Sequence, residues 1–144
     1  MKKSWYDINR GKTIGTKGSE GGVIGRDQEY ERFSRITLEK EGRIAPFTIT
    51  CGIYGWMFHT VYFRTMTKAE DTFAKMQKDL SSIVDDVPAN DDSDAEGRMS
   101  AASILIAEFV DRYPIQSGGV VYEIRVAPAS FPERFRIRKH SASW

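Results

Sequence analysis

The sequence of 144 residues has few of the features that mark secreted, disulfide-rich or membrane-embedded proteins. Its single cysteine, Cys51, excludes an intrachain disulfide and is typical of a reducing compartment. No apolar run approaches the roughly 20 residues needed to span a bilayer. The N-terminal segment MKKSWYDINR contains two lysines but no apolar stretch behind them, so no signal peptide is visible. We therefore expect a cytoplasmic protein that is not embedded in a membrane.

The composition is that of an ordinary globular protein. Hydrophobic residues make up 40% and charged residues 28% of the chain, which argues against wholesale disorder. A chain of this length typically forms one domain and buries roughly two-thirds of the surface that it exposes when unfolded. We expect a single domain over residues 1–144, with a polar C-terminal tail near 139–144.

The net charge is only +1, but the charges are unevenly distributed. Residues 67–111 contain 4 Lys/Arg and 11 Asp/Glu, a net charge of −7, whereas the segments before and after them carry +4 each. An acidic middle between basic flanks fits either charge complementarity within one fold or a surface that recognises a polar partner.

Two amphipathic helices are predicted within this acidic middle. The segments near 67–86 and 93–112 repeat apolar residues at steps of three and four. Each begins with the S/T-x-x-E pattern of a capping box, at Thr67 and at Ser93. The connection between them is short, so we expect an antiparallel hairpin whose acidic side chains face solvent.

The remaining segments have the composition of strands. Before the helices these are GVIGRDQEY, FSRITLEKE, APFTITCGI and WMFHTVYFR, and after them GGVVYEIRV and ERFRIRK. We therefore predict an α+β fold in the order ββββααββ. It would be a mainly antiparallel sheet of four to six strands, with the two-helix hairpin packed on one face.

The segment NRGKTIGTKGSEGG, residues 9–22, is rich in glycine and contains lysine, as phosphate-binding loops do. A P-loop, G-x-x-x-x-G-K-[ST], would need its first glycine at Tyr6 and a helix after the loop, and the sequence supplies neither. We predict a mobile or tightly turned surface loop whose glycines adopt positive φ. The alternative is a non-standard anion nest made from Lys12, Lys17 and backbone N–H groups.

A metal site is not predicted, and neither is a cofactor. The stretch DSDAEG, residues 92–97, resembles the start of an EF-hand loop, which requires a bidentate glutamate at position 12. That position is Ser103, inside the second predicted helix.

Cys51 and His59 are the nucleophile and base that the sequence offers, since His140 lies in the polar tail. A turn with an odd number of residues between their strands would bring both side chains to one face of the sheet, and an even number would separate them. The sequence leaves both arrangements open. Because a cysteine in so apolar a strand is usually an inert hydrophobic residue, we do not predict a catalytic dyad.

Two further patterns have a structural and a functional interpretation. RFRIRKH, residues 134–140, suits either a protected edge strand or contacts with nucleic-acid phosphates and bases. The rest of the domain is not basic enough for a convincing nucleic-acid footprint, which argues against that partner. Aromatic residues crowd at Trp56, Phe58, Tyr62 and Phe63, where they would form core or an exposed apolar platform.

No catalytic motif remains, although scattered acid and base residues need leave no local signature. We predict a small non-catalytic binding or regulatory domain of bacterial type that acts through protein contacts, such as an immunity or antitoxin-like protein. Its expected partner is a basic protein, and Asp91, Asp92 and Asp94 between the helices are the candidate partner-binding residues.

The alternative hypothesis is a small-ligand-binding protein or modest enzyme. Its pocket would lie between the sheet and the helices, and His59, Tyr62 and Tyr122 are the candidate ligand-binding residues.

Overall fold

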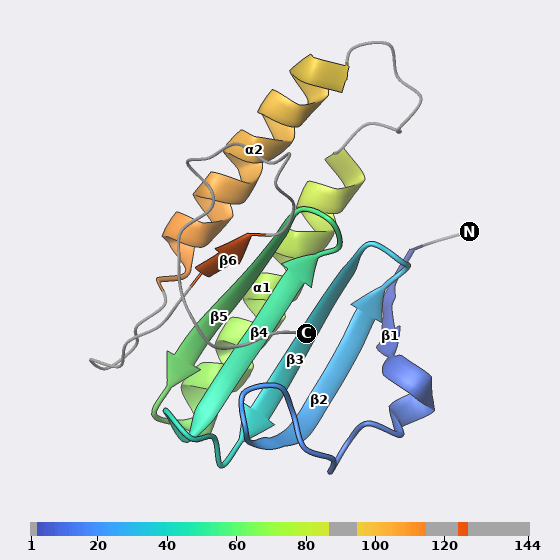
Figure 1. Cartoon of the computed structure of the whole chain (residues 1–144). Coiled ribbons are helices and arrows are strands. Elements are labelled where there is room, and N and C mark those ends of the chain that lie inside the picture. The colour runs from blue at the N-terminus through green and yellow to red at the C-terminus, as the bar shows by residue number, and fades with distance from the viewer. Residues whose placement is uncertain (1–2, 87–94, 115–123, 127–144) are drawn as a thin grey trace.

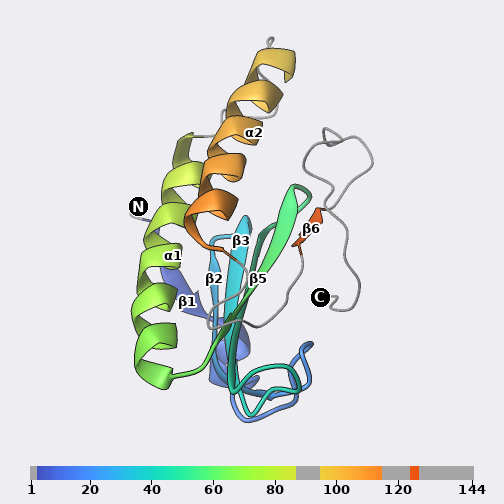
Figure 2. The same ribbon diagram turned by 90° about the vertical axis from the view of Figure 1, so that its left-hand side faces the viewer.

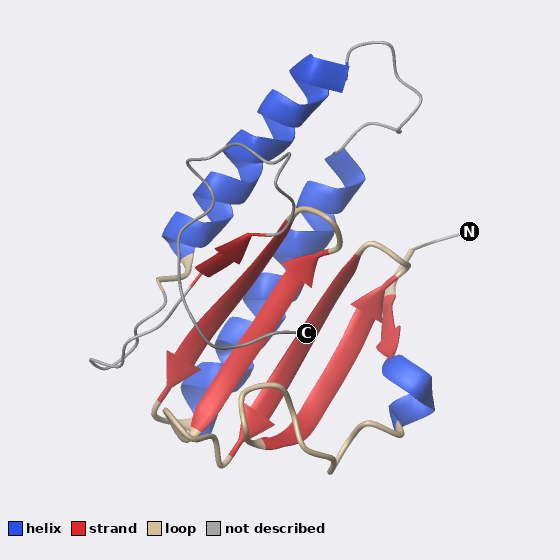
Figure 3. Ribbon diagram, in the orientation of Figure 1, coloured by secondary structure: helices blue, strands red, loops and turns tan. Residues whose placement is uncertain are grey.

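The computed structural model describes residues 3–86, 95–114 and 124–126. Figure 1 shows an antiparallel sheet with two helices behind it, and Figure 3 separates the two layers by colour. The α+β class predicted from the sequence is confirmed. In chain order the elements are β1 (Trp5–Asp7), the 3₁₀ helix η1 (Ile8–Gly11), β2 (Val23–Tyr30), β3 (Ser34–Lys40), β4 (Phe47–Ile53), β5 (Met57–Phe63), α1 (Met66–Asp86), α2 (Ala95–Arg112) and β6 (Ile124–Val126).

The sheet is a meander of six strands in the order β1-β2-β3-β4-β5-β6, and every neighbouring pair is antiparallel. The four strands predicted before the helices are present, and β6 lies within the predicted strand GGVVYEIRV. The first strand, β1, was not predicted, because three residues are too few to show an alternating pattern. The predicted edge strand ERFRIRK lies outside the described residues.

The turn between β4 and β5 decides which side chains share a face. Ile53 pairs with Met57, so the loop consists of three residues, Tyr54 to Trp56, with Gly55 at φ 80°. Three-residue hairpin loops need one residue in the left-handed region, which glycine adopts without strain. This odd loop places Cys51 directly opposite His59, on the same face of the sheet.

The first helix begins one residue earlier than predicted. The Thr65 hydroxyl accepts a hydrogen bond of 3.2 Å from the Lys68 N–H, and its carbonyl accepts one from the Ala69 N–H. Thr65 is therefore the N-cap, and the prediction that Thr67 opens a capping box is wrong. Ser93, the predicted cap of the second helix, lies outside the described residues.

Both helices pack on the same face of the sheet, as Figure 2 shows from the side, and they run antiparallel to each other. The predicted stripe of α1 is buried, including Phe73, Met76 and Leu80, and it lies against β3, β4 and β5. Burying each large apolar side chain stabilises the fold by about 1.5–3 kcal/mol, so this interface holds the layers together. Further core residues are Ile36, Leu38, Ile49, Cys51, Val61, Phe63, Ile106 and Phe109.

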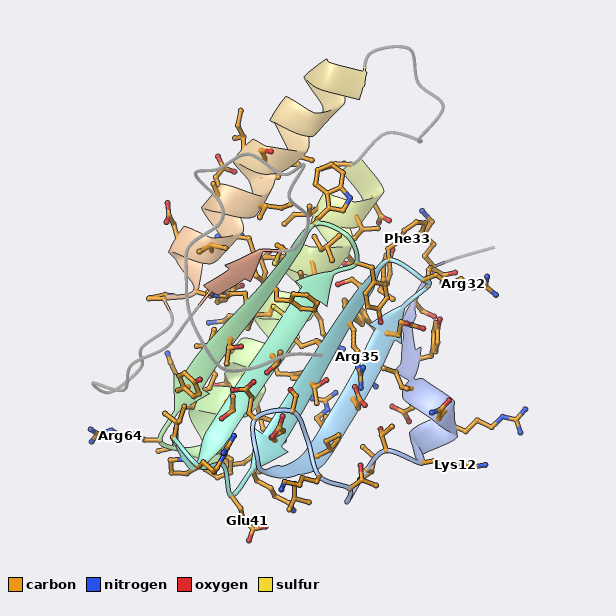
Figure 4. All side chains as sticks on the ribbon, viewed as in Figure 1. Lys12, Arg32, Phe33, Arg35, Glu41 and Arg64 are labelled. Atoms are coloured by element: carbon orange, nitrogen blue, oxygen red, sulfur yellow. The ribbon has the colours of Figure 1, made fainter. Side chains whose placement is uncertain are left out.

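The opposite face of the sheet is polar. The Asp27 carboxylate on β2 is buried and forms a bidentate ion pair with Arg35 on β3, at 2.9 and 2.8 Å. It also accepts a hydrogen bond of 2.9 Å from the Thr37 hydroxyl. Figure 4 shows Arg35 over the sheet, whereas Lys12 and Arg64 project from its rim. Because the pair neutralises a buried carboxylate, removing Arg35 alone would leave an uncompensated charge.

Candidate functional site

A groove of about 230 Å³ lies between α1 and α2. Its lining comes from one face of each helix, because the residues recur at steps of three and four. They are Asp79, Ser82, Ile83 and Asp86 of α1, and Leu105, Glu108 and Arg112 of α2. The groove thus combines three carboxylates, one guanidinium and an apolar floor.

Asp79 is already paired within the fold. It accepts a hydrogen bond of 2.8 Å from Arg112 and another from the Tyr113 hydroxyl. The hydrogen bond to Asp79 raises the pKa of Arg112, while burial and then the same carboxylate raise the pKa of Tyr113. The sequence predicts that Asp79 lies mostly towards solvent, but its side chain is only 26% exposed, because it joins the end of α2 to α1.

Asp86 and Glu108 are exposed and form no ion pair with any residue that the structure describes. Asp86 is also the last residue of α1, where the helix dipole is negative, and the last turn contains no basic residue. The neighbouring Asp85 differs, because it binds Tyr30 at 3.0 Å and Lys3 at 3.5 Å. Asp86 and Glu108 are thus the carboxylates of the groove that a partner can reach.

The predicted partner-binding residues Asp91, Asp92 and Asp94 lie outside the described residues. In the sequence they fall between Asp86 at the end of α1 and Ala95 at the start of α2. Asp86 and Glu108 were not among the partner-binding residues predicted from the sequence. Each lies three residues after an apolar residue, Ile83 or Leu105, and so beside an apolar stripe, which is the signal that would have found them.

The glycine-rich loop between β1 and β2 does contain an anion nest, and the anion is the chain's own Glu39. The buried carboxylate of Glu39 accepts hydrogen bonds of 3.1 Å from the Glu20 N–H and 2.9 Å from the Gly22 N–H. A Cβ atom at Gly18 would lie 2.2 Å from the carboxyl carbon of Glu39, so a larger residue there would displace this carboxylate. These contacts explain Gly18 and Gly22 without a bound phosphate.

The other N–H groups of this loop are used mainly by backbone carbonyls, as in Gly15 to Ile24 and Gly18 to Gly22. Of the lysines proposed for a nest, Lys17 pairs with Val23 in an isolated bridge, and Lys12 lines an open hollow of about 370 Å³ with Asn9 and Arg10.

Cys51 and His59 meet across β4 and β5 in the core rather than in a cleft. Burial raises the pKa of the Cys51 thiol. Burial also lowers the pKa of His59 to about 4, although the hydrogen bond to the Tyr113 carbonyl acts in the opposite direction. The His59 Nε2–H donates to the Tyr113 carbonyl at 2.7 Å, because a carbonyl can only accept. Both groups are neutral near pH 7, and a nucleophile requires the thiolate, so the arrangement is structural.

The candidate ligand-binding residues are not brought together. His59 faces the helices, whereas Tyr62 lies on the polar face, where its hydroxyl is 3.4 Å from Glu20. The crowded aromatic residues are likewise divided, because Phe63 belongs to the core and Phe58 to the polar face. Tyr122 lies outside the described residues. Neither hollow described above lies between the sheet and the helices.

Within the described ranges, no three His, Cys, Asp or Glu side chains are grouped in a way that could hold a metal ion. The EF-hand-like stretch begins at Asp92 and lies largely outside these ranges. In the same part of the chain, neither helix has the length and apolar character needed to cross a membrane. No family model matches the chain, and no curated protein or solved structure shows significant similarity to it.

Proposed function

We propose that the protein is a binding module that recognises a basic protein partner through the groove of its helical hairpin. The observation that carries the proposal is the pair of exposed carboxylates, Asp86 and Glu108, which face each other across this groove without an ion-pair partner in the described part of the chain. Such a module would act in the cytoplasm. It would act by binding its partner and not by catalysis, as an immunity or antitoxin-like protein does.

The groove suits a lysine or arginine side chain. Ile83 and Leu105 offer apolar surface to its methylene stem, while Asp86 and Glu108 offer charge-assisted hydrogen bonds to its head. The existing pair between Arg112 and Asp79 is an internal example of this contact, at 2.8 Å in the same groove. The negative end of the α1 dipole adds to the attraction.

The sequence around the groove extends the acidic surface. Asp91, Asp92 and Asp94 lie in the sequence between the end of α1 and the start of α2, and they would add to the potential that draws a basic partner towards the hairpin. Since exposed charges are screened over about 8–10 Å at physiological salt, the association rate should fall as salt is added.

The test uses the full chain and a fluorescent peptide rich in lysine and arginine. Asp86→Asn combined with Glu108→Gln should weaken binding about two- to thirtyfold at low salt, from ~0.2–1 kcal/mol for each exposed ion pair. Fluorescence anisotropy at low and physiological salt measures the affinity. Capture from the source lysate, compared between wild type and variant, then identifies the natural partner.

The matched control removes two negative charges elsewhere, through Asp71→Asn and Glu41→Gln. Both residues are exposed, and Figure 4 shows Glu41 projecting from the end of the sheet. The control should bind the peptide like the wild type. Equal weakening in the two variants would mean that net charge, and not the groove, determines binding, and the proposal would be wrong.

A further inference from the structure

Arg112 already makes, inside the groove of the hairpin, the kind of contact that a basic partner would make. Among the described residues that line the groove, it carries a positive charge, whereas Asp79, Asp86 and Glu108 are acidic. Its Nη1 atom donates a hydrogen bond of 2.8 Å to Oδ2 of Asp79 on the facing helix. The guanidinium therefore occupies one of the carboxylates that the groove would otherwise offer to a partner.

This ion pair lies at the surface, so it is easy to break. The side chain of Arg112 is 51% exposed and that of Asp79 is 26% exposed. Pairs as exposed as this contribute little to stability, because water and salt screen the attraction and a long side chain loses conformational freedom. A second cation that enters the groove can therefore replace Arg112 on Asp79 at a small cost in free energy.

The end of α2 is held in place by contacts that do not involve the guanidinium. Tyr113, the residue after the helix, donates its hydroxyl hydrogen to Oδ2 of Asp79, and its carbonyl accepts the hydrogen bond of 2.7 Å from His59 on β5. The Tyr113 ring also packs against Phe109, with 5.0 Å between the ring centres. These contacts keep both helices and the Asp79 carboxylate in position when Arg112 moves away.

Asp79 has room for a further donor. Both of its hydrogen bonds end on Oδ2, and Oδ1 accepts none from a residue that the structure describes. A carboxylate has two oxygens with about four acceptor positions. When Arg112 leaves, Tyr113 still occupies one position, and the remaining ones can accept hydrogen bonds from an incoming guanidinium or ammonium group.

We propose that Arg112 is a built-in competitor of the basic partner. It occupies Asp79 in the free protein, and a lysine or arginine of the partner displaces it. The proposal rests on the binding function proposed above, and it adds Asp79 to Asp86 and Glu108 as a carboxylate that the partner uses. Because a tethered competitor has a high effective concentration, it excludes weak basic ligands and favours a partner that places a charge at Asp79.

The test is Arg112→Gln in the full chain, with binding of the fluorescent peptide rich in lysine and arginine measured by anisotropy at low salt. The variant should bind about two- to tenfold more tightly, because it releases Asp79 and removes a like charge from the groove. The matched control, Lys12→Gln, removes the same charge from the β1–β2 loop, where Figure 4 shows Lys12 projecting from the rim. Its gain should be clearly smaller. Far-ultraviolet circular dichroism verifies that each variant folds.

The same substitution in an Asp79→Asn background separates the release of Asp79 from the loss of a positive charge. There, Arg112→Gln has no carboxylate to release, so its gain should be at least about twofold smaller than in the wild type. Three results would overturn the proposal: no tighter binding by Arg112→Gln, an equal gain for Lys12→Gln, or an equal gain in the Asp79→Asn background. Failure of the proposed function is a different result, namely equal binding by the wild type and the Asp86→Asn, Glu108→Gln variant.

Discussion

His59 should make the protein lose stability as the pH falls from neutral towards 4. Its side chain is 1% exposed, between Cys51 of the facing strand and the ring of Phe109, whose centre lies 6.1 Å away. The Nε2–H is committed to the Tyr113 carbonyl at 2.7 Å, and Nδ1 has no partner among the described residues. A proton added to Nδ1 would therefore place an unpaired charge in the core.

The magnitude follows from the two pKa values. Burial lowers the pKa of His59 from 6.5 in the unfolded chain to about 4 in the fold. Between these values the unfolded state binds a proton that the folded state does not, so the free energy of unfolding decreases with falling pH. At about 1.4 kcal/mol for each pH unit, the loss reaches about 3 kcal/mol at pH 4. That is a large part of the 5–15 kcal/mol of a typical domain.

The assay compares urea unfolding of the wild type and His59→Gln between pH 7.5 and 4. Glutamine can donate to the Tyr113 carbonyl but cannot be protonated, and the carboxylates that titrate in this range are common to both chains. The wild type should therefore lose about 3 kcal/mol more than the variant, mostly below pH 6.5. Parallel curves, or a wild type that gains stability in acid, would refute the burial of a neutral His59.

Two other substitutions test local features of the fold. Gly18→Ala should lower the free energy of unfolding in urea by about 1–3 kcal/mol. The added Cβ would lie 2.2 Å from the carboxyl carbon of Glu39 and would displace this carboxylate from its backbone donors. Gly25→Ala is the control, since its Cβ would meet nothing closer than 3.7 Å, and an equal loss there would contradict this reading. Thr65→Ala should lower the midpoint of thermal unfolding through the loss of about 1 kcal/mol of N-cap stabilisation. Thr67→Ala should have little effect on this midpoint. A larger decrease for Thr67→Ala than for Thr65→Ala would show that Thr67 is the N-cap.

The sequence by itself determined the class of the fold and most of its elements, but not the short strand β1. The stripe through Phe73, Met76 and Leu80 predicts α1 because a helix must bury one face, and the burial of these residues agrees. The β-branched and aromatic runs from Val23 to Phe63 likewise predict a sheet, since such side chains pack well on a pleated surface. These signals are local, so they can be read without knowing what packs against them.

The tertiary structure alone decided where the functional groups lie. The length of the β4–β5 loop determines whether Cys51 lies on the same face as His59. Because side chains alternate between the faces of a strand, one residue more or fewer would place them on opposite faces. The Glu39 carboxylate occupies the glycine-rich loop, a contact between residues 17 positions apart that no local pattern encodes. Asp79 is neutralised by Arg112 from the next helix, which leaves Asp86 and Glu108 as the exposed acids of the groove. The physical reason is common to all three: charge, hydrogen bonding and burial depend on neighbours in space, which the chain supplies only once it is folded.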